Sequence, residues 1–295
     1  RQMCIRDRYT GNSCCVHGII EFSNYCRNDC LYCGLRKSNQ KIKRYRMDID
    51  QIVETADYAV NRLGFKALVF QSGEDLWYDE EKIIEIIKQV RKRCACLIIL
   101  SLGEMEEKLY SEAYKAGARG VLLRFETSNP MLYEKFRPGH FLEERIKLIE
   151  KLISLGYLIM TGFLIGLPGQ TKNDIEKDID LTASLKPEMF SFGPFIPHPD
   201  TPLGNCPKPS LELVLDTIAN ARIKYPSSRI LVTTALETLD KKNGLRLGLL
   251  SGANSLMINV TPEEYRLLYE IYPERIGTEI SVEERINSAV SYTHL

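Results

Sequence analysis

The stretch LEERIKLIEKLISLGYLIMTGFLIG, residues 142–166, contains the pattern that decides the fold. Its first half places Ile146, Ile149 and Ile153 on one stripe of a helix, with leucines between them. Gly156 follows, at the position where a helix that turns back usually ends. Residues 157–166 are then mostly apolar, which is typical of a buried strand. The stretch therefore predicts a helix, a tight turn and a strand.

The same alternation extends over most of the chain. We expect strands at 16–23, 66–71, 96–102, 120–126, 157–166, 189–196, 229–235 and 253–260. We expect helices at 50–63, 80–90, 106–116, 142–155, 172–185, 210–225 and 239–250. Connections of this length join parallel strands with helices outside, and eight strands suggest closure. The sequence therefore predicts an α/β protein, a closed parallel (β/α)8 barrel of the TIM type.

No linker or low-complexity tract divides the chain, so we expect a single barrel domain over residues 9–289. Residues 1–8 (RQMCIRDR) and 290–295 (VSYTHL) show no amphipathic period. We interpret both as non-native sequence, which leaves the barrel truncated at both ends.

Composition excludes several classes of partner. Lysine plus arginine and aspartate plus glutamate each number 39, and this zero net charge argues against nucleic acid as a partner. No apolar run approaches the roughly 20 residues of a membrane span. Nine cysteines without a secretory signal fit a reducing cytoplasm, where clustered cysteines usually serve metals or catalysis.

Polar or glycine-rich motifs follow nearly every expected strand, whereas the turns before the strands are plain. The motifs are FSNYC, QSGED, SLGE, RFET, GLPGQT, GPFIPHPDTPL, TTALET and NVTPEEY. In barrels of this kind the active site lies at the carboxyl ends of the strands. The distribution therefore predicts one central site.

Cys26, Cys30 and Cys33 form a C-x3-C-x2-C motif directly after the first expected strand. Three thiolates this close on a loop can bind a 4Fe–4S cluster, and no nearby fourth cysteine completes the ligand set. An open coordination site is typical of a metal centre that does chemistry. The alternative is a structural zinc site completed by Cys15 or His17, but both precede or open the strand and would lie at the opposite end of the barrel.

Charged residues mark other positions. Period-two alternation puts Arg124 and Glu126 on one face at the end of the fourth expected strand, which predicts either a mutual ion pair or a charged ligand. The basic run at residues 41–46 (KIKRYR) is interpreted as a solvated face. His198, in a proline-rich loop that we interpret as a stiff lid, is expected to brace that loop. Ordinary thiols are expected at Cys94, Cys96 and Cys206.

Residues 21–39 (EFSNYCRNDCLYCGLRKSN) resemble the HydE-type maturases of FeFe-hydrogenase. That family belongs to the radical S-adenosylmethionine (SAM) superfamily and is related to methylornithine synthase and biotin synthase. The resemblance continues through QSGED, SLGE, LLRFETSNP, GLPGQT, GPFIPHPDTPL, TTA and GAN…NVTP, and covers roughly residues 16–272.

The resemblance implies an enzyme that cleaves SAM reductively to a 5′-deoxyadenosyl radical during maturation of the hydrogenase cluster. Its implied substrate is a cysteine-bound iron carbonyl–cyanide precursor, and its implied cofactors are SAM and one 4Fe–4S cluster. Cys206 is the last cysteine of the sequence, so no cysteines near the C-terminus could bind a second cluster. A donor such as ferredoxin or flavodoxin and the other hydrogenase maturases are the implied partners, in the cytoplasm.

The resemblance also assigns roles to individual residues. Cys26, Cys30 and Cys33 would be the catalytic cluster ligands. SAM would be bound by Tyr32, Gln71, Ser72, Gly73, Arg124, Glu126, Arg145 and Gly166. The substrate cavity would be lined by Ser101, Met189, Thr233, Thr234 and Tyr265.

Three alternatives stay open on sequence alone. The first is a methylornithine-synthase-like mutase. The second is a biotin-synthase-like sulfur-inserting enzyme, although no cysteine set supports a sulfur source. The third is a non-catalytic carrier of an iron–sulfur cluster. Glu237 stands where a small residue is expected, which leaves the substrate open as well.

Overall fold

The apolar and amphipathic runs fold into alternating strands and helices in the computed structural model, which describes residues 2–10, 14–277 and 280–293. The strands are β1 (Cys15–Ser23), β2 (Ala67–Ser72), β3 (Leu97–Ser101), β4 (Gly120–Leu122), β5 (Leu158–Thr161), β6 (Leu164–Ile165), β7 (Met189–Phe190), β8 (Gly193–Pro194), β9 (Leu231–Val232) and β10 (Ser255–Asn259).

The helices are α1 (Gln2–Thr10), α2 (Ile49–Asp57), α3 (Glu80–Arg93), α4 (Glu107–Ala116), α5 (Pro130–Phe136), α6 (Leu142–Ser154), α7 (Lys172–Ser184), α8 (Leu211–Lys224), α9 (Thr234–Leu239), α10 (Gly244–Leu250), α11 (Glu263–Arg266) and α12 (Val282–Thr293). A π-helical turn, Tyr58–Arg62, continues α2. Within the described ranges, none of these helices is long and apolar enough to cross a membrane.

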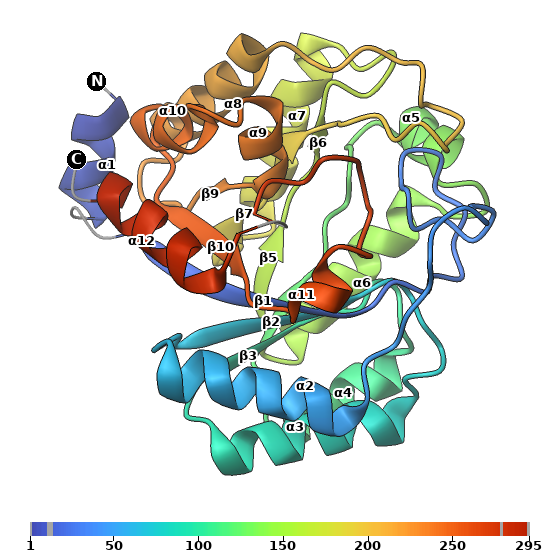
Figure 1. Ribbon diagram of the computed structural model, residues 1–295. Coiled ribbons are helices and arrows are strands. Elements are labelled where there is room, and N and C mark those ends of the chain that lie inside the picture. Colours follow the sequence, from blue (N-terminus) through green and yellow to red (C-terminus); the bar gives the residue numbers. More distant parts are fainter. Residues whose placement is uncertain (1, 11–13, 278–279, 294–295) are drawn as a thin grey trace.

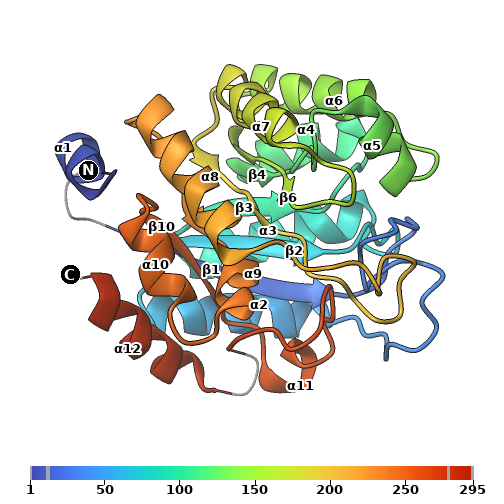
Figure 2. The same cartoon turned by 90° about the horizontal axis from the view of Figure 1, so that it is seen from above.

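Eight strands of the described chain form one parallel sheet in the order β7-β5-β4-β3-β2-β1-β10-β9. The helices surround this sheet (Figure 1, and from above in Figure 2). Its two edges meet through an isolated parallel bridge between Phe190 and Ile230, beside which the Phe190 N–H donates to the Arg229 carbonyl at 2.8 Å. The predicted barrel is confirmed, but it is nearly closed rather than closed, because β7 and β9 are only two residues long.

Two of the expected strands are interrupted. The expected strand 157–166 divides into β5 and β6, and 189–196 divides into β7 and β8. The first break is at Gly162, directly after β5. A Cβ on this residue would lie 2.2 Å from the carbonyl oxygen of Ser191, directly after β7, so only glycine allows these two segments to come this close. Beyond the breaks, β6 and β8 pair with each other and extend the wall of the barrel at its mouth.

An apolar layer fills the barrel interior. Its buried members are Ile19, Ala67, Val69, Ile99, Met160, Met189 and Leu231, contributed by strands on every side. This layer occupies the middle of the barrel, as expected for a packed core rather than a pore. The cavity described below is therefore found on the side of this layer where the carboxyl ends of the strands lie.

Several elements differ from the expectation. The expected helix 239–250 is α9 and α10, and α9 already begins at Thr234, which ends the expected strand 229–235 early. Helices α1, α5, α11 and α12 were not expected: α5 and α11 are short, α1 lacks an apolar stripe, and α12 ends in residues that were interpreted as non-native. The residues interpreted as non-native lie mainly in α1 and at the end of α12.

Candidate active site

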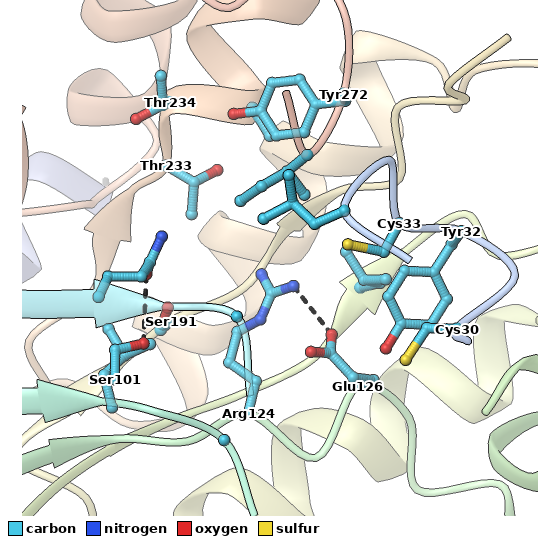
Figure 3. Close-up of a pocket in the computed structure, with 18 of the residues that line it drawn as sticks. Cys30, Tyr32, Cys33, Ser101, Arg124, Glu126, Ser191, Thr233, Thr234 and Tyr272 are labelled. Atoms are coloured by element: carbon cyan, nitrogen blue, oxygen red, sulfur yellow. Dashed lines mark hydrogen bonds and ion pairs between the residues drawn. The ribbon is translucent and has the colours of Figure 1, made fainter. Parts of the chain in front are cut away.

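A cavity of 310 Å³ opens at the carboxyl ends of the barrel strands. All but three of the residues that the sequence assigned to cofactor and substrate line this cavity. Figure 3 shows Cys30 and Cys33 on one side, Thr233 and Thr234 on the opposite side, and Arg124 between them. The structure therefore brings the predicted cysteine and polar groups together in one site.

The cysteine loop follows β1 and is held by backbone hydrogen bonds on three sides. The Arg27 N–H donates to the Glu74 carbonyl (3.0 Å), and the Leu31 N–H donates to the Phe136 carbonyl (2.9 Å). The N–H that follows Cys33, on Gly34, donates to the Ile271 carbonyl at 2.8 Å. The loop is thus tied to the end of β2, to α5 and to the C-terminal part of the chain.

Gly73 allows close contact with the cysteine loop. A Cβ at this position would lie 2.2 Å from the Tyr25 carbonyl oxygen and 2.8 Å from the Cys26 Cβ. The resemblance assigned Gly73 to SAM binding, since a residue without a side chain would let the backbone approach the cofactor closely. The structure shows a close approach to the backbone that carries the first cysteine.

The three cysteine thiols all line the cavity. Burial raises the pKa of Cys26, Cys30 and Cys33, so each thiol holds its proton until a metal displaces it. Among the described residues, no three His, Cys, Asp or Glu side chains are grouped closely enough to hold a single ion. The ligands of a cubane cluster bind different irons and therefore stand further apart. Cys15 and His17 contact each other at 3.8 Å, at the other end of β1, which argues against the zinc alternative.

Tyr32 lies between the second and third cysteines and lines the cavity. It packs against the apolar cluster that contains Leu164 and Phe195, and its hydroxyl accepts a hydrogen bond from Arg137 at 3.4 Å. Arg137 is 6% exposed and lines the same cavity. Arg137 was not identified from the sequence, because this residue directly follows α5 and no helix was expected there.

Arg124 and Glu126 form an ion pair at 2.9 Å on the cavity wall. The expected strand 120–126 is shorter than predicted, because β4 ends at Leu122, but both side chains still line the cavity, as the sequence predicted. Glu126 has φ of 66°, a left-handed conformation that costs a residue with a side chain about 1–2 kcal/mol. Strained backbone of this kind often occurs at functional sites.

Arg145 is almost fully buried and has a carboxylate partner that the sequence did not suggest. Its Nε lies 2.7 Å from Glu104 Oε1, and it also donates to the Tyr133 hydroxyl at 3.2 Å. Burial would raise the pKa of Glu104, but Arg145, Arg137 and His140 together lower it. A carboxylate therefore already occupies the position next to this guanidinium.

Small hydroxyl and amide groups also line the cavity. The Ser101 hydroxyl donates to Gln71 Oε1 at 3.2 Å, and the Ser72 hydroxyl donates to the Gly73 carbonyl at 2.6 Å. Thr233 caps α9 through the Leu236 N–H. Ser191, which the sequence did not identify, also lines the cavity.

Three predicted site residues lie outside the cavity. Gly166, with φ of 85°, donates its N–H to Gln170 Oε1 at 2.7 Å and forms a turn. Met189 belongs to the apolar layer beneath the cavity. Tyr265 packs against Tyr45 outside the barrel, 5.0 Å between ring centres, because α11 directs it towards α2.

A segment near the C-terminus adds residues that the sequence missed. Tyr269, Tyr272 and Arg275 all line the cavity. Arg275 pairs at 2.5 Å with Glu21, which is fully buried at the end of β1. The alternation that identified Arg124 and Glu126 would also have placed Glu21 inside the barrel, beside Ile19.

Other residues of interest have structural partners. His198 is 2% exposed and braces its loop: its Nδ1 accepts from the Asp200 N–H at 3.1 Å. Glu237 pairs with Arg285 of α12 and does not line the cavity, so it does not bear on substrate choice. Cys94 is buried, and Cys96 and Cys206 are partly buried.

Comparison with known proteins defines the class of enzyme. Residues 20–182 match the radical SAM superfamily, and the chain belongs to that superfamily. Enzymes of this class use a 4Fe–4S cluster and SAM. The chain is 44% identical over 272 residues to the "[FeFe] hydrogenase maturase subunit HydE" of Thermotoga maritima, covering 92% of this chain and 77% of that protein. It is therefore a homologue of the HydE maturases.

Methylornithine synthases are also relatives. The enzyme of Methanosarcina acetivorans is 31% identical over 89% of this chain and 74% of that protein. A crystal structure of methylornithine synthase superimposes with a TM-score of 0.87 and 26% identity, covering 99% of this chain and 85% of that one. The same barrel thus supports both types of enzyme.

The residues of the cavity fit the cofactors of this class. Among the described residues, Cys26, Cys30 and Cys33 are the cysteines that line the cavity, and their thiolates would provide ligands for three irons. Arg124 and Glu126 supply charges of both signs, which suit the amino and carboxylate groups of an amino acid.

Proposed function

We propose that Cys26, Cys30 and Cys33 bind a 4Fe–4S cluster and leave one iron for the amino and carboxylate groups of SAM. When bound and reduced, the cluster would supply the electron that breaks a carbon–sulfur bond of the SAM sulfonium, which gives methionine and a 5′-deoxyadenosyl radical. The observation that carries the proposal is that the three thiols line the same cavity as the paired charges of Arg124 and Glu126.

The other polar residues would bind and orient SAM. Arg145 would exchange Glu104 for the SAM carboxylate, since a guanidinium fork matches either partner. Tyr32 would contact the adenine, while Gln71, Ser72 and Gly73 would form the wall near the amino group. Because Gly166 lies outside the cavity, its contribution would be limited to the turn.

The radical would act on a substrate in the remaining space, lined by Ser101, Thr233 and Thr234. We propose maturation of the FeFe-hydrogenase cluster, with a cysteine-bound iron carbonyl–cyanide precursor as substrate. The 44% identity to a HydE maturase, against 31% to a methylornithine synthase, supports this choice. A ferredoxin or flavodoxin would supply the electrons, and other hydrogenase maturases would act with this enzyme in the cytoplasm. Residues 9–289 would form one domain.

Anaerobic incubation of the reconstituted, dithionite-reduced protein with SAM tests the proposal. We expect 5′-deoxyadenosine, and its absence would favour a cluster carrier. Adding the iron precursor then tests the choice of substrate: conversion of the iron complex supports the maturase, and a protein that cleaves SAM but leaves the complex unchanged would contradict it.

A further inference from the structure

The segment that follows the cysteines, residues 34–46, is not the solvated face that its charges suggest. It contains the basic run KIKRYR and lies at the mouth of the barrel, between β1 and α2 (Figures 1 and 2). Lys41 and Lys43 are exposed, but Ile42 and Tyr45 are buried and Arg44 is half-buried. Arg44 therefore points back towards the protein.

The Arg44 guanidinium donates hydrogen bonds to four backbone carbonyls. Nη1 donates to Asn24 (2.5 Å) and Leu35 (2.9 Å). Nη2 donates to Arg36 (2.8 Å) and Asn39 (3.2 Å). Four carbonyls around one side chain make this a specific contact rather than a chance surface contact.

These carbonyls stand on both sides of the cysteine motif. Asn24 precedes Cys26 by two residues, and Leu35 follows Cys33 by two residues. A single planar fork therefore ties the beginning of the loop to its end. Lysine could not replace it, since an ammonium has three donors and no rigid fork.

Two asparagine side chains complete the same arrangement. Asn24, fully buried, donates through Nδ2 to the carbonyls of Lys43 and Leu268, each at 2.8 Å. Its Oδ1 accepts from the Tyr45 N–H at 2.8 Å. Asn39 donates to the Gly34 carbonyl at 2.9 Å. The loop ends are thus held entirely by protein groups.

We propose that Arg44 is a positioning residue that closes the cysteine loop and holds Cys26 and Cys33 in place before the cluster arrives. The inference rests on the proposed ligand role of the cysteines. Binding to a loop that is already ordered avoids the conformational entropy lost when a flexible loop becomes ordered. The cluster should therefore be retained more firmly than the three thiolates alone would allow.

The test compares the full chain with Arg44→Met, Arg44→Lys and a matched control, Arg119→Met. Arg119 also donates to two carbonyls, of Tyr114 (2.6 Å) and Ala118 (2.8 Å), but precedes β4 at the far end of the barrel. Hydrogen exchange of residues 24–47 is measured in the metal-free proteins by mass spectrometry. Loss of iron to a chelator is measured in the reconstituted proteins.

For Arg44→Met we expect at least tenfold faster exchange in residues 24–47 and at least tenfold faster loss of iron. Arg44→Lys should resemble Arg44→Met, and Arg119→Met should resemble the wild type. If Arg44→Met exchanges hydrogen and retains iron like the wild type, the proposal is overturned. It is also overturned if Arg44→Lys behaves like the wild type, because a positive charge alone would then suffice. Global unfolding of both Arg44 variants would also overturn it. If the wild-type protein takes up no iron, the assignment of the cysteines as cluster ligands is wrong. Hydrogen exchange in the metal-free proteins then still tests whether Arg44 orders the loop.

Discussion

Replacing Gly73 with alanine should disable the cluster site while leaving the barrel folded. The new Cβ would start 2.2 Å from the Tyr25 carbonyl oxygen, whereas real Cβ contacts are at least 3.0 Å, so the two segments must separate by about 0.8 Å. The segment that moves carries Cys26. Active sites need their groups within about 0.5 Å of the productive geometry, and a displacement of about 1 Å can lower a rate by about 100-fold.

We therefore expect Gly73→Ala to form 5′-deoxyadenosine about 100-fold more slowly than the wild type, with a loss of stability of about 1–3 kcal/mol from overpacking. The assay measures 5′-deoxyadenosine by chromatography in anaerobic, dithionite-reduced protein, together with thermal unfolding. Gly64→Ala is the control for a loss of stability without a clash: its left-handed backbone (φ 82°) disfavours alanine, but nothing lies within 4 Å of its Cβ position, so SAM cleavage should stay at the wild-type rate. Wild-type SAM cleavage by Gly73→Ala would refute the view that Gly73 sets the position of the cysteine loop.

Two further predictions concern buried charges outside the cavity. Arg285→Met should lower the free energy of unfolding by about 3 kcal/mol, because it leaves the buried Glu237 without its partner, whereas Arg229→Met, which breaks an exposed pair, should cost less than about 1 kcal/mol. Denaturant unfolding measures both, and equal losses would contradict the structural role of the Glu237 pair. Burial raises the pKa of Asp178 from 3.8 to about 6, so the folded chain holds a proton that the unfolded chain releases between about pH 4 and pH 6. The contribution of Asp178 to stability should fall by about 3 kcal/mol as the pH rises through this range, and an unchanged pH profile in Asp178→Asn would refute this.

The sequence predicted the barrel because its strands and helices repeat with clear periods. It could not predict the interruptions: the break between β5 and β6 depends on the distance from Gly162 to the Ser191 carbonyl, which only the folded chain sets. The sequence could not predict that the barrel is only nearly closed, because the bridge between Phe190 and Ile230 depends on how far the sheet curls.

The candidate site was predicted where its residues belong to local motifs at strand ends. It was missed where long charged side chains arrive from elsewhere. Arg137 and Arg275 stand in irregular segments, and nothing near them in sequence shows that they line the cavity. Arg44 was misinterpreted for a related reason: a run of basic residues usually indicates solvent, and its four carbonyl partners become apparent only in the folded loop.

The central claim is that three thiolates leave one iron of a cluster open to SAM. The most direct measurement is electron paramagnetic resonance of the reduced, reconstituted protein, with and without SAM labelled with ¹⁷O in its carboxylate. We predict a cluster signal that changes when SAM is added and that shows a magnetic coupling to the labelled oxygen. Purified protein that contains zinc, or a cluster signal that SAM leaves unchanged, would contradict the account.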